Sequence, residues 1–258
     1  MSRSDDRTHD HAPFTLDVTS PELLHDWVPQ RLLVVCARPR HAEDEVGGSV
    51  ARWITHGAVA RLVCCTSGDA DAEDPSADPF SVAAEREREQ RAAAQVIGYE
   101  SVSFLHRPDG AIANDLALRE QLVRLVRAFR PDTVALPDPR FIIGPDGRIN
   151  DSDRRAAGLA VIDAIGPARE AMAFPTLAMS GGLAPWSVER LVLTGSQEPN
   201  AAVDISHSID RKVSALHAHA GDGRDPARVE TDIRERAASA NYDVAAVEML
   251  SVIQLHQG

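Results

Sequence analysis

The chain has 258 residues, of which 43% are hydrophobic and 26% are charged, and this balance is typical of one globular α/β domain with a sizeable core. Its formal net charge of -12 argues against sequence-independent binding to nucleic acid or to an anionic membrane. Since no apolar run reaches membrane-spanning length and the polar N-terminus lacks the apolar middle of a secretory signal, the cytoplasm is the expected location.

Short apolar runs alternate along the chain with longer segments of helical periodicity. Residues 1–20 are expected to be a flexible polar tail, and residues 21–258 a single domain. The acidic segment 68–78 shows no periodicity and is predicted to be a loop. The predicted strands are residues 31–37, 58–66, 101–106, 133–136, 187–193 and 203–205, and the predicted helices are residues 47–56, 81–98, 114–129, 207–220 and 228–238.

This alternation predicts βαβ units and therefore an α/β fold, Rossmann-like, with three layers and a mostly parallel central sheet. The three cysteines, Cys36, Cys64 and Cys65, lie in apolar β-like runs without a CxxC pair, so they are predicted to be buried free thiols. No GxGxxG or GxxxxGK[ST] motif follows a strand, which argues against a nucleotide or nicotinamide cofactor. In such sheets, ligands bind at the carboxyl ends of the strands.

The loop after the first predicted strand, residues 37–52, reads ARPRHAEDEVGGSVAR. It resembles, at equal length, the segment A-H-P-D-D-E-x-x-G-x-G-G-T-x-A-R of the LmbE-like (PIG-L) N-deacetylases. Four more blocks follow in the family's order: R-x-x-E from Arg86, F-L-x-x-P-D-G over residues 104–110, I-N-H-P-D-H-R-A-x-G over residues 148–163, and V-D-I…K-x-x-A-L-x-A-H over residues 203–219. The pattern is most similar to the actinobacterial, mycothiol-deacetylase-like branch, and it implies that family's deacetylase fold.

In this family, zinc is bound by the first-loop histidine, the second aspartate of H-P-D-D-E and the last histidine of H-P-D-H, while the first aspartate is the general base. Without gaps, the ligand positions fall on Arg38, His41 and Arg154, and the base falls on Arg40. Arginine stays protonated and offers no lone pair to a metal. This comparison therefore predicts a degenerate site with no zinc cofactor.

A second register stays open. Sliding the comparison by three residues places His41-Ala42-Glu43-Asp44-Glu45 on H-P-D-D-E, with His41 and Asp44 as ligands of a zinc cofactor. This register shortens the glycine turn and still leaves Arg154 in place of the third ligand. A rebuilt site would take that ligand from Asp151, Asp153 or His219.

The replacements favour an anionic small molecule as ligand. Arg38, Arg40 and Arg154 would bring three guanidinium groups to one pocket, and guanidinium groups suit carboxylate or phosphate. Gly47 and Gly48 are expected to open the next helix, whose N-terminal amides also favour anions. The resemblance adds Arg86 and Asp109 as substrate-binding residues.

Three functions remain for this pocket. In the first, a zinc-independent member binds or processes an anionic ligand, with His41, Asp153 and His219 as candidate catalytic residues. In the second, a metal-dependent hydrolase removes an acyl group from an N-acyl amino sugar through the rebuilt site. In the third, the arginines pair with neighbouring carboxylates and the chain is a non-catalytic structural or regulatory partner. A homo-oligomer is compatible with all three, and no nucleic acid or membrane partner is expected.

Overall fold

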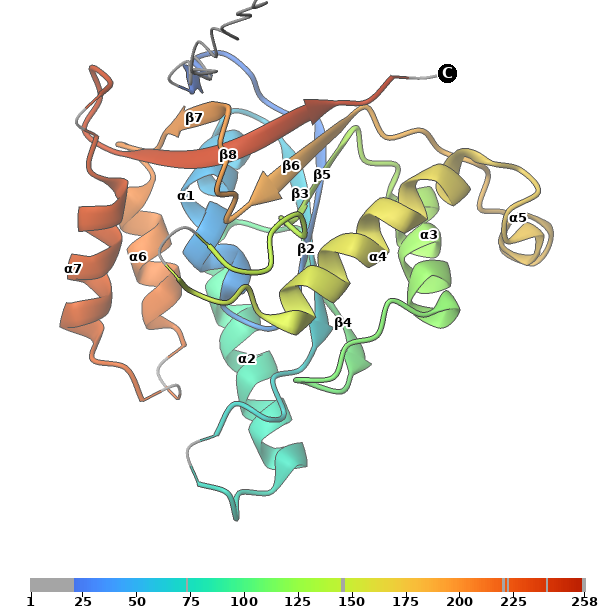
Figure 1. The fold of residues 1–258 in the computed structure, drawn as a ribbon, viewed down its shortest axis with the longest axis horizontal. Helices are drawn as coiled ribbons and strands as arrows, with labels where there is room; N and C mark the ends of the chain where they lie inside the picture. Colours follow the sequence, from blue (N-terminus) through green and yellow to red (C-terminus); the bar gives the residue numbers. More distant parts are fainter. Residues whose placement is uncertain are drawn as a thin grey trace, which may run out of the picture.

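The computed structural model describes residues 21–72, 74–144, 147–219, 221, 223–239 and 241–256, without the side chain of residue 180. This part of the chain forms an eight-stranded sheet with the order β1-β7-β8-β6-β5-β2-β3-β4 (Figure 1). The strands are β1 (Glu22–Leu23), β2 (Arg31–Cys36), β3 (Val59–Thr66), β4 (Ser101–Arg107), β5 (Thr133–Pro137), β6 (Arg190–Thr194), β7 (Ala201–Asp204) and β8 (Val247–Gln254).

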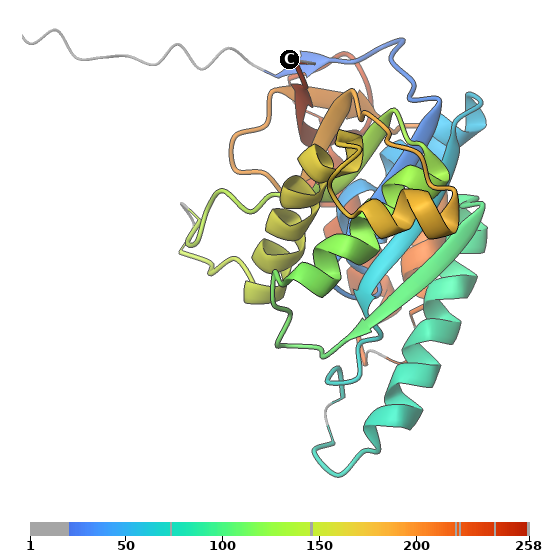
Figure 2. The same ribbon diagram turned by 90° about the vertical axis from the view of Figure 1, so that its right-hand side faces the viewer.

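Helices cover both faces of the sheet, so the fold has three layers. On one face α1 and α2 pack against α6, with α7 beside α6, and on the other α3 packs against α4 with α5 near its end (Figure 1). Figure 2 shows α3, α4 and α5 in front of the sheet. The helices are α1 (His41–Thr55), α2 (Pro79–Ile97), α3 (Leu116–Phe129), α4 (Ser152–Arg169), α5 (Pro175–Gly181), α6 (Ile209–His217) and α7 (Pro226–Ala237).

The continuous apolar sequence of β2 follows from its position between these two layers. Leu32 and Val34 face the core beneath α1, α2 and α6, whereas Leu33 and Val35 face the core beneath α3 and α4. All four are at most 2% exposed. A strand buried on both faces needs apolar side chains at every position, which is why β2 shows no alternation.

The strand order locates the functional end of the sheet. From β2 the chain adds β3 and then β4 on one side, and it then returns to place β5 on the other side of β2. Such a reversal leaves a crevice at the carboxyl ends of the two central parallel strands. Arg38 follows β2 and Asp138 follows β5 at this crevice. Strand β8 runs antiparallel to both β6 and β7.

The predicted fold class is confirmed: five strand pairs are parallel and two are antiparallel. The predicted burial of the three free cysteines is also confirmed. The predicted strands and helices are present with shifted ends, whereas β1, β8, α4 and α5 were not predicted. The tail expected over residues 1–20 lies outside the described residues. None of the described helices is long and apolar enough to span a membrane.

The prediction that Gly47 and Gly48 open a helix is wrong. Helix α1 begins six residues earlier, at His41, so both glycines lie in its interior. The early start depends on Arg40, the residue before the helix, whose φ of 75° lies in the left-handed region. The backbone N–H of Arg40 donates to the Gln90 side chain of α2 (2.8 Å), which holds this strained residue in place.

Candidate functional site

The three positions that the gapless comparison assigns to the metal ligands lie together. Arg38 follows β2, His41 is the first residue of α1, and Arg154 lies in the first turn of α4. Both guanidinium groups are near enough to His41 to lower its pKa. The comparison therefore relates residues that are also neighbours in space.

Each of the two arginines is paired with a carboxylate. Arg38 forms an ion pair with Asp151, the N-cap residue of α4. Arg154 forms an ion pair with Glu45 of α1, and Glu45 also accepts a hydrogen bond from Thr194 at the end of β6. These pairs tie α1, α4 and β6 together around His41. In the second register Glu45 falls on the last position of H-P-D-D-E and Asp151 is a candidate third ligand, whereas the structure pairs each of them with an arginine.

His41 is neutral in this environment. Burial, and then the charges of Arg154 and Arg38, lower the pKa of His41 to about 3. Its Nδ1 atom is enclosed and has no hydrogen-bond partner among the described residues. Because the imidazole is a weak base here, proton uptake at neutral pH would require a negatively charged ligand beside it.

The two neighbouring pairs respond differently to burial. Burial raises the pKa of Glu45 and outweighs the opposing effects of Arg154 and Thr194. Burial would also raise the pKa of Asp151, but the Asp153 backbone N–H and Arg38 lower it below its ordinary value.

Asp153 and Asp109 lie next to the cluster, on the side of Arg38. Asp153 is fully buried, and its carboxylate accepts hydrogen bonds from the backbone N–H groups of Gly110 (2.6 Å) and Ile112 (3.0 Å). Asp109 Oδ1 lies 3.7 Å from Arg38 Nε, and burial raises the pKa of Asp109 despite this neighbour. Asp153 therefore holds the Pro-Asp-Gly turn that points Asp109 toward Arg38.

His219 lies in a buried polar chain rather than beside the ion pairs. Its Nε2 atom is 3.7 Å from Glu43 Oε2, and neither side chain is more than 2% exposed. Gln90 Nε2 donates to the other oxygen of Glu43 (2.7 Å), while Gln90 Oε1 accepts from the backbone of Arg40. The chain therefore connects His219 to the residue that starts α1.

Arg86 is placed in a buried clamp. Its guanidinium donates to Glu89 (2.8 Å) and to the backbone carbonyls of Gly221 (2.6 Å) and Asp71 (3.2 Å). Glu89 in turn accepts from the Gly221 backbone N–H (2.7 Å). These contacts hold the segment after α6 against α2. In this structure the Arg86 guanidinium binds other groups of the protein.

A second interaction that sequence reasoning missed anchors the middle of α1. Lys212 and Glu248 form a buried ion pair with Nζ and Oε1 2.6 Å apart. Glu248 also accepts from the backbone N–H groups of Gly48 (2.9 Å) and Ser49 (2.7 Å). A Cβ at Gly48 would lie 3.0 Å from Glu248 Oε1 and 2.9 Å from Ile205, so glycine permits this approach. Gly48 and Glu248 are separated by 200 residues, so no local sequence pattern indicates this contact.

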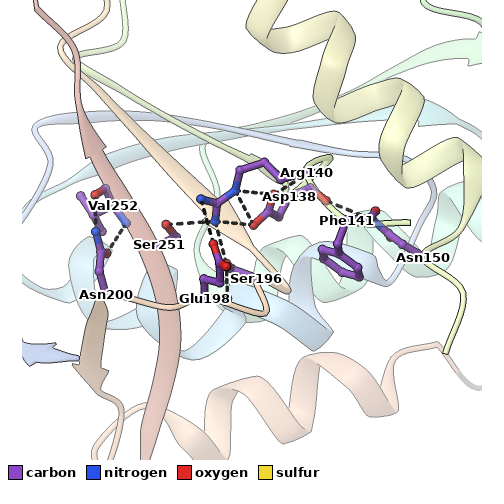
Figure 3. Close-up of polar contacts among 9 residues, drawn as sticks. All are labelled: Asp138, Arg140, Phe141, Asn150, Ser196, Glu198, Asn200, Ser251 and Val252. Atoms are coloured by element: carbon purple, nitrogen blue, oxygen red, sulfur yellow. Dashed lines mark hydrogen bonds and ion pairs between the residues drawn. The ribbon is translucent and has the colours of Figure 1, made fainter. Parts of the chain in front are cut away.

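A third missed group follows β5. Arg140 donates through Nε (3.0 Å) and Nη2 (2.7 Å) to the buried carboxylate of Asp138 and reaches Ser196 Oγ (3.0 Å) and Ser251 Oγ (3.4 Å) (Figure 3). Asn150 Nδ2 donates to the backbone carbonyl of Asp138 (3.1 Å). These contacts hold the start and end of the loop that leads to α4 and its arginine. The sequence Asp138-Pro139-Arg140, directly after a predicted parallel strand, could have indicated this group, since ligands and functional side chains gather at that end of such sheets.

An open cavity of about 940 Å³ adjoins the cluster. Arg40 and Asp44, on either side of His41 in the sequence, line its inner end, and α7 forms the opposite wall. Arg236 of α7 donates to Asp44 (2.6 Å), and this pair also borders a second cavity of about 220 Å³ that reaches Glu45. Burial would raise the pKa of Asp44, but Arg236 lowers it below its ordinary value. We call the first space the arginine-lined cavity, after Arg40, Arg148, Arg224, Arg228 and Arg236.

Comparison with known proteins identifies the family. A model of the family described as "PIG-L: GlcNAc-PI de-N-acetylase" matches residues 33–165, from β2 through most of α4. The chain belongs to this PIG-L deacetylase family. The match contains the loop after β2, α1 and the start of α4, and therefore all three clustered positions.

Individual PIG-L relatives agree with this assignment. The chain is 26% identical over 192 residues to diacetylchitobiose deacetylase from Thermococcus kodakarensis, covering 72% of this chain and 68% of that protein. It is 25% identical to 1D-myo-inositol 2-acetamido-2-deoxy-alpha-D-glucopyranoside deacetylase from Kineococcus radiotolerans, covering 74% and 68%. The fold is similar to N,N'-diacetylchitobiose deacetylase from Pyrococcus horikoshii, with a TM-score of 0.79, 23% identity and coverage of 88% and 84%. The family resemblance is thereby confirmed.

The side chains at the clustered positions do not suit the zinc ion that this family uses. Arg38 and Arg154 have no lone pair to donate, and each already binds a carboxylate. The second register supplies His41 and Asp44, but Asp44 is engaged with Arg236. Within the described ranges, no group of three or more histidine, cysteine, aspartate or glutamate side chains is arranged to hold a metal.

Proposed function

We propose that this PIG-L family member works without zinc and binds an anionic small molecule at the carboxyl end of its sheet. The observation that carries the proposal is the replacement of the metal-ligand positions by two arginine–carboxylate pairs around a neutral His41. A metal-bound water would have to form beside two fixed guanidinium charges, which repel the cation.

The same features support a negatively charged ligand. An anion near His41 would be attracted by Arg38 and Arg154 and would meet Arg40 at the inner end of the arginine-lined cavity. A neutral imidazole can donate or accept a hydrogen bond at that point. Asp109, Asp153 and His219 would then support the pocket, while His41 and Arg40 contact the ligand.

One observation favours the alternative of a metal-dependent hydrolase. His41 and Asp44 are three residues apart on α1 and therefore lie on one side of the helix. Release of Asp44 from Arg236 would leave both side chains available to one ion. The substrate would then be an N-acyl amino sugar, as the names of the two curated relatives state for those proteins.

Zinc stoichiometry tests the proposal directly. Purified protein is analysed by elemental mass spectrometry as isolated, and again after equilibration with excess zinc and dialysis. We expect far less than one zinc per chain in both preparations, and no acetate release from N,N'-diacetylchitobiose with or without added zinc.

The opposite result would establish the alternative. One tightly held zinc per chain that is lost in His41→Ala and in Asp44→Ala, but kept in the matched control His56→Ala, would contradict the proposal. His56 is an exposed histidine at the far end of α1, where its Nδ1 contacts the Arg52 carbonyl, so it controls for non-specific metal binding by histidine. A protein that holds neither zinc nor any anion would instead be a non-catalytic partner.

A further inference from the structure

The arginine-lined cavity carries both signs of charge. The whole chain has 27 basic side chains against 39 acidic ones, whereas the cavity is lined by five arginines and four carboxylates. Basic groups are therefore enriched at this surface in a protein that is acidic overall. The carboxylates are Asp44, Asp225, Asp232 and Glu235.

The backbone of Arg40, at the inner end of the cavity, is held by a chain of buried polar side chains. Arg40 has a left-handed backbone, and its N–H is bound by the fully buried side chain of Gln90. Gln90 is itself oriented by Glu43, which is also fully buried. The left-handed backbone of Arg40, fixed by this buried polar chain, sets the direction in which the side chain leaves the start of α1, at the end of the cavity nearest His41.

The outer wall alternates in charge along one face of α7. Arg228, Asp232 and Arg236 follow at intervals of four residues, so they lie one above the other on the helix. A ligand with acid groups alone would meet Asp232 between the two arginines. A ligand that also has hydroxyl groups could donate hydrogen bonds to the carboxylates while its acid group accepts from the guanidinium groups.

From these features we infer that the arginine-lined cavity binds a sugar phosphate. The phosphate binds to the guanidinium groups of Arg40 and Arg228, and the sugar hydroxyls donate to the carboxylates of Asp232 and its neighbours. This inference rests on the proposed function and moves the anion site outward, from the paired Arg38 and Arg154 to the open cavity. The recognition of the hydroxyl groups is what distinguishes this ligand from free phosphate.

Calorimetric titration tests the inference with a panel of hexose phosphates, the corresponding free hexoses and inorganic phosphate. We expect at least one hexose phosphate to bind at least tenfold more tightly than inorganic phosphate, and the free hexoses to bind too weakly to measure. Arg40→Gln and Arg228→Gln should each weaken that binding by about tenfold or more, since each removes a charge-assisted hydrogen bond.

Arg124→Gln is the matched control. Arg124 is an exposed arginine of α3, on the opposite face of the sheet, and its weak contact with Glu120 spans 3.9 Å. It changes the net charge by the same amount and should leave affinity within twofold. Equal losses in all three variants would show non-specific attraction and overturn the inference.

Two further outcomes separate this inference from the proposed function. Hexose phosphate binding that is lost in Arg38→Gln and in Arg40→Gln but unchanged in Arg228→Gln would place the anion beside His41, so the proposed function would stand and the cavity inference would fail. Binding of inorganic phosphate as tight as that of every hexose phosphate would also overturn it. Far-ultraviolet circular dichroism confirms that each variant is folded before titration.

Discussion

The cluster around His41 and the arginine-lined cavity contain the same kinds of side chain but differ in how their charges are satisfied. In the cluster, Arg154 and Glu45 are 22% and 10% exposed and pair with each other. In the cavity, the Arg236 side chain is 59% exposed although it contacts Asp44. Charges paired away from water cost much to separate, whereas exposed ones exchange readily with solvent or ligand.

The two regions therefore contribute differently to the structure. The cluster connects α1, α4 and β6, and the buried Lys212–Glu248 pair connects α1 to α6 and β8. These contacts stabilise the carboxyl end of the sheet. The cavity next to them retains guanidinium groups at the surface, where a ligand can reach them.

The largest expected effect is on the buried pair that anchors α1. Lys212→Ala should destabilise the protein by about 3–5 kcal/mol, because it leaves the Glu248 carboxylate buried without its cation. Both side chains are at most 6% exposed. Urea unfolding followed by circular dichroism measures the change, with Arg124→Ala expected to stay within about 0.5 kcal/mol. A loss below about 1 kcal/mol for Lys212→Ala would contradict the importance of this pair.

A smaller loss is expected at the cluster itself. Arg154→Met should cost about 2–3 kcal/mol, since Glu45 remains partly buried and retains its bond from Thr194. Adding Glu45→Met should recover most of that loss, because two apolar side chains remove the unpaired charge. Arg228→Met, in the cavity, should change stability by less than about 0.5 kcal/mol. If the double variant is less stable than Arg154→Met, the pair is not the source of the effect.

The smallest expected effect is a change in pH dependence. His41 has a pKa of about 3 when folded against 6.5 for the free side chain, so between these values the unfolded chain binds more protons. Stability therefore falls as pH falls through this window. From pH 7 to 5.5 this residue should contribute about 1 kcal/mol of that loss. Urea midpoints at both pH values should differ less in His41→Gln than in the unaltered protein, while His56→Gln should keep the full difference.

Local sequence determined much of the architecture. The continuous apolar run of β2 required burial on both faces, and the alternation of strands with helices required a mostly parallel sheet. The ordered motif blocks identified the family, and the presence of arginine at positions 38 and 154 was visible without coordinates. Each of these conclusions depends on residues close together in the chain, or on their chemical type alone.

The tertiary structure alone decided what those arginines do. Arg38 meets Asp151 across 113 residues, and Glu45 meets Thr194 across 149. The start of α1 at His41 depends on Gln90, 50 residues from Arg40, and this start turns Asp44 toward α7 and Glu45 toward α4. Pairing at such separations is set by how whole helices pack on the sheet, and periodicity within one segment holds no information about it. The sequence therefore determined which charges are present, and packing decided which of them meet across the fold and how deeply each pair is buried.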